Sequence, residues 1–150
     1  MRTLLLVLML AVALPTSAMT VPVFTEAQLR DKADVVVEGV VAVSQSRRVG
    51  QRIITFVSII SGTAPLLTTT LVAVPGGDVD GFSQRVPGSP VLEVGRRYRL
   101  YLGAADGPRL DDSGACARGV FGFFRGAFLL DDVGGGVVPL GEDGLPVGRR

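Results

Sequence analysis

Two stretches of β-branched residues constrain the fold of this chain more than any other feature of its sequence. Residues 35–43 read Val-Val-Val-Glu-Gly-Val-Val-Ala-Val, and residues 53–60 read Ile-Ile-Thr-Phe-Val-Ser-Ile-Ile. Branched Cβ atoms restrict side-chain rotamers in a helix and pack well on a pleated surface, so both stretches predict β-strands. Because the first stretch is apolar on both faces, we expect it to be covered on both sides, at least in part.

The segment between these stretches predicts a polar turn, so the two strands should form a hairpin. Its charged and turn-forming residues are Arg47, Arg48, Gly50, Gln51 and Arg52. After a break at residues 61–65, residues 68–74 predict a third strand, which ends at Pro75. The three strands would then follow one another as an antiparallel meander.

The middle of the chain alternates between irregular segments and one further strand. Residues 75–95 contain five glycines and three prolines, so regular structure is not expected there. Residues 97–102 predict a fourth strand by their alternation of faces, and residues 103–119 again look like a loop. One face of that strand would carry Tyr98, Leu100 and Leu102, and the other Arg97, Arg99 and Tyr101.

The last part of the chain predicts further short strands. Residues 120–124 and 127–130 predict two strands, or one strand bent at Gly126. A turn at residues 131–136 should lead back into a final strand that begins at Val137. These segments would form a C-terminal hairpin.

One helix is well marked near the start of the chain. Thr25 can cap it, and Gln28, three residues later, completes a capping box. Phe24 and Leu29 are spaced to form a hydrophobic staple around the cap. We therefore predict a helix over residues 26–33.

Short strands separated by Gly and Pro turns, with a single short N-terminal helix, predict a mostly β domain. We expect a small antiparallel OB-like barrel of about five to seven strands, closed or nearly closed, with a small sandwich as the alternative. A closed barrel is favoured because open strand edges rich in valine and isoleucine can pair with other chains and aggregate. The single domain should span residues 19–140, followed by a loose tail at residues 141–150.

Residues 1–18 have the pattern of a secretory signal peptide. Arg2 is a positive n-region, residues 4–14 are an unbroken apolar run, and Thr16 and Ala18 are the small residues before a cleavage site. As a helix this run is about 16 Å long, whereas a bilayer core is about 30 Å thick, so we expect no stable membrane insertion after cleavage. An uncleaved anchor is the alternative. We expect the protein to be secreted or periplasmic.

Charge and composition exclude several classes of function. The formal charge is +1 and would be zero without Arg2, so the chain lacks the broad positive field needed to bind nucleic acid. Histidine and tryptophan are absent and cysteine occurs once, which disfavours metal sites and His-based catalysis. We therefore predict no cofactor, no metal site and no catalytic residue. Cys116 cannot form an internal disulfide, and an intermolecular one and the oligomeric state are left open.

Three segments share a pattern with a known family. They are residues 33–41, an Ala-Asp-Val-Val-Val-x-Gly-x-Val strand; residues 54–62, a paired strand that ends at a glycine; and residues 94–102, a Val-Gly-x-x-Tyr-x-Leu-Tyr-Leu strand. This pattern resembles netrin-like domains and the tissue inhibitors of metalloproteinases, and the Gly/Pro segments resemble small exported bacterial proteins. The resemblance covers about residues 33–138 and implies a five-stranded OB barrel.

The sequence departs from that pattern where the inhibitors carry their chemistry. In those proteins an N-terminal cysteine chelates the zinc of the protease through its amine and carbonyl groups. Here the expected mature chain starts at Met19, and the only cysteine is Cys116. The resemblance therefore implies the barrel and does not extend to the inhibitory residue.

Two segments are candidate binding surfaces. The first is residues 75–95, because long irregular loops in small domains often bind partners; a packed or mobile connector is the alternative. The second is the tip of the first hairpin, which in an OB barrel lies near the usual ligand face; a solvated tip that protects an edge is the alternative. The candidate residues are Arg47, Arg48, Arg52, Asp78, Asp80, Phe82 and Arg85.

We predict an exported, non-catalytic binding domain that recognises another exported protein, with a protease as one candidate, through residues 75–95. Phe82 and Arg85 would be the anchors, because aromatic and arginine side chains dominate protein interfaces. One alternative is a metalloprotease-inhibitor-like protein, which needs a protruding N-terminus or loop. The other is a carboxylate-based hydrolase, which needs two turn acids, such as Asp111 and Asp131, to converge at about 5 to 9 Å.

Overall fold

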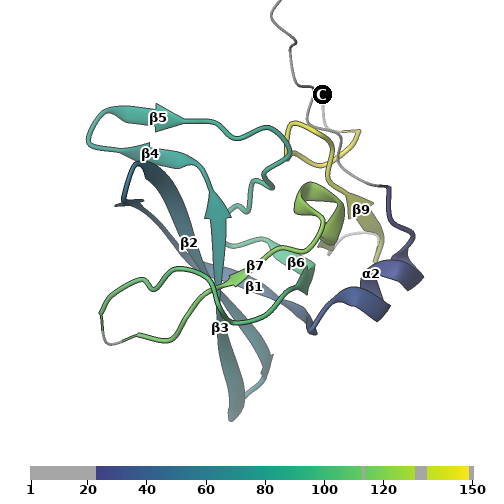
Figure 1. Ribbon diagram of the computed structural model, residues 1–150. Helices are drawn as coiled ribbons and strands as arrows, with labels where there is room; N and C mark the ends of the chain where they lie inside the picture. Colours follow the sequence, from purple (N-terminus) through teal and green to yellow (C-terminus); the bar gives the residue numbers. More distant parts are fainter. Residues whose placement is uncertain (1–22, 113, 131–134, 149–150) are drawn as a thin grey trace, which may run out of the picture.

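The computed structural model describes residues 23–112, 114–130 and 135–148, and within these ranges the protein is mostly β with one α-helix (Figure 1). Its elements are α2 (Glu26–Lys32), β1 (Val35–Val49), β2 (Arg52–Thr63), β3 (Leu66–Pro75), β4 (Gly77–Val79), β5 (Phe82–Gln84), β6 (Arg97–Leu102), β7 (Arg118–Gly119), the 3₁₀ helix η2 (Phe123–Gly126), β8 (Ala127–Leu130) and β9 (Val137–Pro139). The predicted signal peptide at residues 1–18 and the acid Asp131 lie outside the described residues.

The main sheet has the strand order β7-β3-β2-β1-β6-β8-β9, and β4 and β5 form a separate pair. β1 has two partners: residues 35–40 pair with β6, and residues 40–49 pair with β2. A register shift between Val41 and Val43 lies close to this change of partner, as expected for a strand that bends. The predicted meander of β1, β2 and β3, the strand at 97–102 and the C-terminal hairpin are confirmed.

The expected barrel is not closed, because the strand order leaves the sheet open between β7 and β9 in the described part of the chain. The reason lies in the outer edge of β6. Residues 98–100 of β6 pair with β8. Only the C-terminal end of β6 is therefore free to pair with the residue that follows β7. That contact is an isolated bridge between Leu102 and Val120. A 3.0 Å hydrogen bond from the Gly103 N–H to the Gly119 oxygen lies beside it.

β1 is covered mainly on one face, whereas residues 35–43 were expected to be covered on both faces, at least in part. Val37 and Val41 are buried, whereas Val36, Val40 and Val43 on the other face are exposed. The strand therefore alternates like an ordinary half-buried strand, even though valine occupies both faces.

The core lies on the face of the main sheet that carries Val37, Val57 and Leu100. Its buried members are Val37, Val41, Val57, Ile59, Val72, Val74, Leu92, Tyr98, Leu100, Leu102, Phe124, Ala127, Leu129 and Leu140. A smaller cluster of Phe56, Ala73 and Ala117, with Leu71 and Leu110 packed against it, forms separately. The segment that follows β6 thus supplies apolar cover for part of β2 and β3.

The predicted strand at residues 120–124 is wrong, because η2 begins at Phe123. Gly122 and Phe123 have φ angles of 69° and 56°, which a strand cannot accommodate. The N–H of Phe124 donates to the Gly88 oxygen at 2.9 Å, and the Phe124 side chain is buried in the core. This turn therefore ties the segment 75–95 to the core.

Helix α2 begins at the predicted capping box and ends one residue earlier than predicted. The Gln28 N–H donates to the Thr25 hydroxyl at 3.3 Å, and the Thr25 N–H donates to the Gln28 side-chain oxygen at 2.9 Å. Leu29 is only 1% exposed, so the helix is held mainly by this one apolar side chain.

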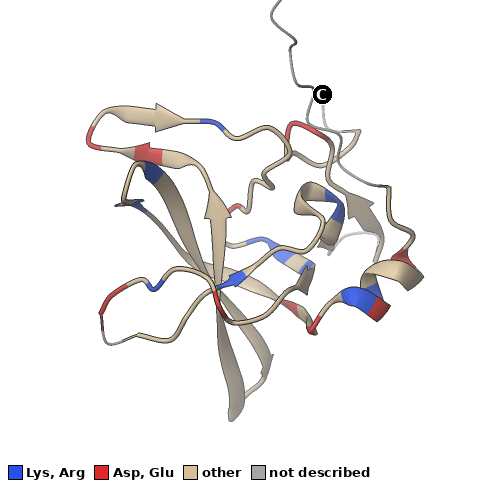
Figure 2. Ribbon diagram, in the orientation of Figure 1, with Lys and Arg blue, Asp and Glu red and all other residues tan. Residues whose placement is uncertain are grey.

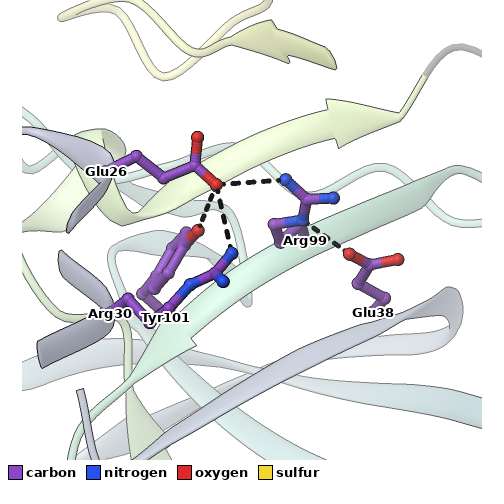
Figure 3. A network of polar contacts seen from close by, with 5 residues as sticks. All are labelled: Glu26, Arg30, Glu38, Arg99 and Tyr101. Carbon is purple, nitrogen blue, oxygen red and sulfur yellow. Dashed lines mark hydrogen bonds and ion pairs between the residues drawn. The ribbon is translucent and has the colours of Figure 1, made fainter. Parts of the chain in front are cut away.

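A polar network also holds α2 on the sheet (Figure 3). The carboxylate of Glu26 accepts a hydrogen bond from the Tyr101 hydroxyl at 2.9 Å and pairs with Arg99 at 3.3 Å and with Arg30 at 3.5 Å. Arg99 also donates to Glu38 on β1 at 2.6 Å, which raises the pKa of its guanidinium. Burial and the bond to Glu26 raise the pKa of Tyr101. The network joins α2, β1 and β6.

Residues 141–148, predicted as a loose tail, make backbone contacts with the rest of the chain. The Val147 N–H donates to the Pro139 oxygen at 3.0 Å. The Val91 N–H donates to the Gly144 oxygen at 2.9 Å. The C-terminal turn therefore lies beside the segment 75–95.

Candidate functional site

The segment 75–95 contains a regular hairpin, so the expectation that it lacks regular structure is wrong. Strands β4 and β5 pair antiparallel, with Val79 opposite Phe82, and Asp80 and Gly81 form the turn between them. Both turn residues have positive φ, 49° and 80°, as in the type I′ turns that match the twist of a hairpin. An Asp-Gly dipeptide is a strong sequence signal for this turn.

Hydrogen bonds fasten the base of this hairpin to β2, and one of the β2 side chains involved is bonded in turn to β1. The Gly76 N–H donates to the Ile53 oxygen at 2.8 Å, and the Ile53 N–H donates to the Gln84 side chain at 2.6 Å. The Thr55 hydroxyl donates to the Gly76 oxygen at 2.7 Å and lies 2.9 Å from the hydroxyl of Ser46. Because these side chains sit on paired strands, the hairpin has a fixed position on the sheet.

Gly77 packs so closely against the sheet that no side chain fits there. A Cβ atom at this position would collide with the hydroxyls of Ser46 and Thr55. Its φ of 132° is also one that L-residues rarely adopt. The close contact between β4 and the main sheet therefore requires glycine at this position.

The structure brings together residues from the two predicted surfaces. Phe82, at the start of β5, is 63% exposed, and the guanidinium carbon of Arg48 lies 5.1 Å from its ring centroid. This is the distance of a cation–π contact. The tip of the β1–β2 hairpin and the β4–β5 hairpin thus form one surface, with Arg52 exposed at the start of β2.

Two of the other predicted residues, Asp78 on β4 and Arg85 directly after β5, form a charged pair. Asp78 lies 3.5 Å from Arg85, and both side chains are exposed. A hydrogen bond with Ser83, helped by the positive charge of Arg85, lowers the pKa of the Asp78 carboxyl. Asp80 is exposed in the turn. Asp78 is therefore held as a carboxylate.

Arg47 points away from this surface. Its guanidinium donates to the Leu110 backbone oxygen and lines a second hollow, of about 320 Å³. Arg48, Arg109, Asp111 and Asp112 also line that hollow. Arg48 therefore borders this hollow and also contacts Phe82, whereas Arg47 bonds to Leu110.

A groove of about 410 Å³ lies between the β4–β5 hairpin and the main sheet. Hydroxyl groups line one part of it, and apolar side chains and Glu142 and Asp143 line the rest. The hydroxyl residues are Ser44, Ser46, Thr55 and Ser89, and the apolar ones include Val57, Val74, Val86 and Leu92. Asp78 and Arg85 also line it, so the groove carries a net negative charge.

Sequence reasoning missed the hydroxyl groups and the acids of the C-terminal turn. Ser44 and Ser46 alternate along β1, and the register of a hairpin places Ser46 opposite Thr55, so that pair was open to prediction. Glu142 and Asp143 reach the groove only through a contact between distant parts of the chain, and nothing in their local sequence indicates it.

The chemistry available at this surface is that of hydrogen bonding, apolar contact and charge. In the ranges that the structure describes, no three metal-binding side chains gather at one place. Cys116 lies outside the groove and is partly exposed beside Arg109, and their contact raises the pKa of the arginine.

Comparison with protein-family models, with curated proteins and with solved structures finds no match to this chain. Of the helices in the described ranges, none is long and apolar enough to cross a membrane.

Proposed function

We propose that this chain is an exported, non-catalytic binding domain that recognises a segment of another exported protein. The recognition surface is the β4–β5 hairpin together with the groove beneath it. The observation that carries the proposal is the exposed ring of Phe82 beside the guanidinium of Arg48, on a hairpin that is bonded to a rigid sheet. Exposed aromatic and arginine side chains are the types that contribute most to protein interfaces.

The rigidity of the hairpin supports this proposal. Ordering a loop on binding costs free energy, and a loop already held in place avoids that cost. The bonds that Ile53 and Thr55 make with the hairpin provide this order before a partner arrives. The Asp-Gly turn adds a backbone conformation that is favourable on its own.

The groove supports an extended segment as the bound part of the partner. Its volume lies in the range of about 300 to 1,000 Å³ that is typical of ligand sites. Hydroxyl groups can bond to the backbone of such a segment, and apolar walls can accept its side chains. The charges of the paired Asp78 and Arg85 balance each other, so the net negative charge of the groove comes from Glu142 and Asp143. This charge favours a segment that carries Lys or Arg.

The carboxylates at the groove support binding rather than hydrolysis. A general acid needs a raised pKa, whereas the pKa of Asp78 is lowered by its partners. The sequence also lacks the histidine that most often acts as a general base.

We further propose an OB-like connectivity for the open sheet. The parallel pairing of β7 with β3 supports it, since it returns the chain to the edge of the meander. The bridge between Leu102 and Val120 supports it as well, together with the 2.8 Å hydrogen bond from the Phe121 N–H to the Tyr101 oxygen. In OB folds, which are partly open barrels, loops beside the sheet form the ligand site.

The test is capture of exported proteins from the producing cells by the immobilised protein, followed by binding measurements with the purified captured partner. Phe82→Ala should weaken binding by about thirtyfold, a loss typical of an interface anchor, and Arg48→Ala should weaken the same interaction. Val137→Ala removes another exposed apolar side chain, on β9 at one edge of the main sheet, and should bind as the wild type does.

Equal binding by Phe82→Ala and the wild type would contradict this surface. Capture of nothing above a blank column would contradict the binding function altogether. Recovery of a metalloprotease whose activity falls in the complex would instead favour the inhibitor-like alternative.

A further inference from the structure

The β2–β3 hairpin ends in an uncharged tip that projects from the body of the protein (Figure 1). No charged residue occurs between Arg52 and Asp78, and Figure 2 shows this stretch free of acidic and basic residues. Leu66 and Leu67 are 82% and 58% exposed, and Ile60 is exposed beside them. Soluble proteins usually protect such a strand with charges, prolines or bulges along its edge.

The outer edge of β3 is open over six residues. On one side the whole strand pairs with β2. On the other side, within the described residues, only Val72 and Ala73 pair with another strand, β7. Every second residue of 66–71 therefore directs its backbone N–H and C=O groups toward the open side, where an incoming strand can pair with them.

The sequence of this edge is self-complementary. Residues 67–71 read Leu-Thr-Thr-Thr-Leu, which is the same in both directions around Thr69. In an antiparallel pair of two such edges, Leu67 faces Leu71 of the second copy, and Thr68 faces Thr70. Both kinds of pair stabilise a sheet, and no like charges meet.

The side chains beside this edge also favour a second copy. Leu71 packs against the small cluster that contains Phe56 and Ala73. A Leu67 side chain from the second copy would lie next to Leu71 and extend that cluster. The low formal charge of the chain, +1, gives little long-range repulsion between copies.

We propose that two copies of this chain associate through their β3 edges, antiparallel and centred on Thr69, to form one continuous sheet. The contact is isologous, as in most dimers of identical chains. Its strands are short, so the dimer is weak and depends on concentration in the micromolar to millimolar range.

The register can be tested by sedimentation of charged variants. In the proposed pair, position 68 faces position 70 of the second copy. T68E/T70E alone and T68K/T70K alone should each weaken self-association by about tenfold or more, because the two-fold axis repeats every like-charge contact. An equal mixture of the two variants should associate with each other, because every contact then joins opposite charges.

Two controls separate this result from misfolding and from other surfaces. Thr63→Lys adds a charge to the same hairpin outside the paired residues and should keep the self-association of the wild type. Phe82→Ala should keep it too, since Phe82 lies on the separate β4–β5 hairpin. Thermal unfolding of each variant alone should remain close to that of the wild type.

A wild-type protein that stays monomeric up to millimolar concentration would overturn the proposal. So would a mixture of the two charged variants that does not associate. If the wild type stays monomeric but sediments with phosphatidylglycerol vesicles, the tip binds a lipid surface and the proposed dimer is wrong.

Discussion

Replacing Gly77 by alanine should detach the β4–β5 hairpin from the main sheet while the core stays folded. The added methyl group would collide with the hydroxyls of Ser46 and Thr55, and the backbone would have to keep a φ near 132°. These hydroxyls belong to residues that face each other on β1 and β2. They can turn aside only by giving up the hydrogen bonds that Thr55 makes with Ser46 and Gly76.

The magnitude follows from these contacts. An unfavourable backbone conformation costs an L-residue about 1 to 3 kcal/mol. Loss of the bonds from Thr55 to Ser46 and to Gly76 adds about 0.5 to 1.5 kcal/mol each. The free energy needed to open the hairpin should therefore fall by about 2 to 6 kcal/mol, whereas a whole domain is typically stable by about 5 to 15 kcal/mol.

Amide hydrogen exchange measures this opening. The N–H groups of Gly76 and Ile53 make the bonds at the base of the hairpin. They should exchange about tenfold faster for each 1.4 kcal/mol lost. The amide of Leu100, whose side chain is buried in the core, should keep its protection.

Gly81→Ala is the matched control. Gly81 also has positive φ, but a Cβ atom there would have no neighbour within 4 Å. In this variant the free energy needed to open the hairpin should fall only by the cost of the unfavourable backbone conformation, about 1 to 2 kcal/mol. Equal losses in the two variants, or unchanged exchange at Gly76 in Gly77→Ala, would refute the packing argument.

Two further predictions concern stability. Leu29→Ala should lower the free energy of unfolding by about 2 to 5 kcal/mol, because it leaves a cavity where the buried leucine packs under α2. Denaturant titration measures this loss, and a titration curve equal to that of the exposed variant Asp31→Ala would contradict the prediction. The pKa of Asp78 lies below the value of about 3.9 for an unfolded aspartate, so its stabilising contribution is complete above that pH and is lost as the pH falls through its folded value. In thermal unfolding against pH, Asp78→Asn should lose this dependence and Asp80→Asn should keep it, and identical profiles for both would count against the pair.

The long strands and the helix could be predicted because their signals are local. The signals are the β-branched residues in 53–60, the alternation that begins 97–102 and the capping box at Thr25, and each depends on neighbours in sequence. The covering of β1 could not be predicted in the same way. Valine occupies both faces of that strand, so only the position of the other elements decides which face is buried.

The openness of the sheet could not be predicted from any one segment either. Whether β7 joins β6 along its length is decided by β8, which takes residues 98–100 of the shared edge. In the same way the groove forms only where the C-terminal turn meets the segment 75–95.

The structure brings two of the predicted site residues into contact. Arg48 and Phe82 come from two segments far apart in the sequence, so their contact cannot be predicted from either segment alone. The β4–β5 hairpin itself could have been, because the dipeptide Asp80-Gly81 lies between Val79 and Phe82. The high glycine and proline content of residues 75–95 masks this local signal.

The docking of α2 has a consequence for the order in which the chain folds. A seven-residue helix is too short to persist alone in water. The residues that receive it, Arg99 and Tyr101, leave the ribosome more than seventy residues after Glu26. We therefore expect α2, although it is synthesised before the strands described here, to be among the last elements to become ordered, with the early meander assembling ahead of it.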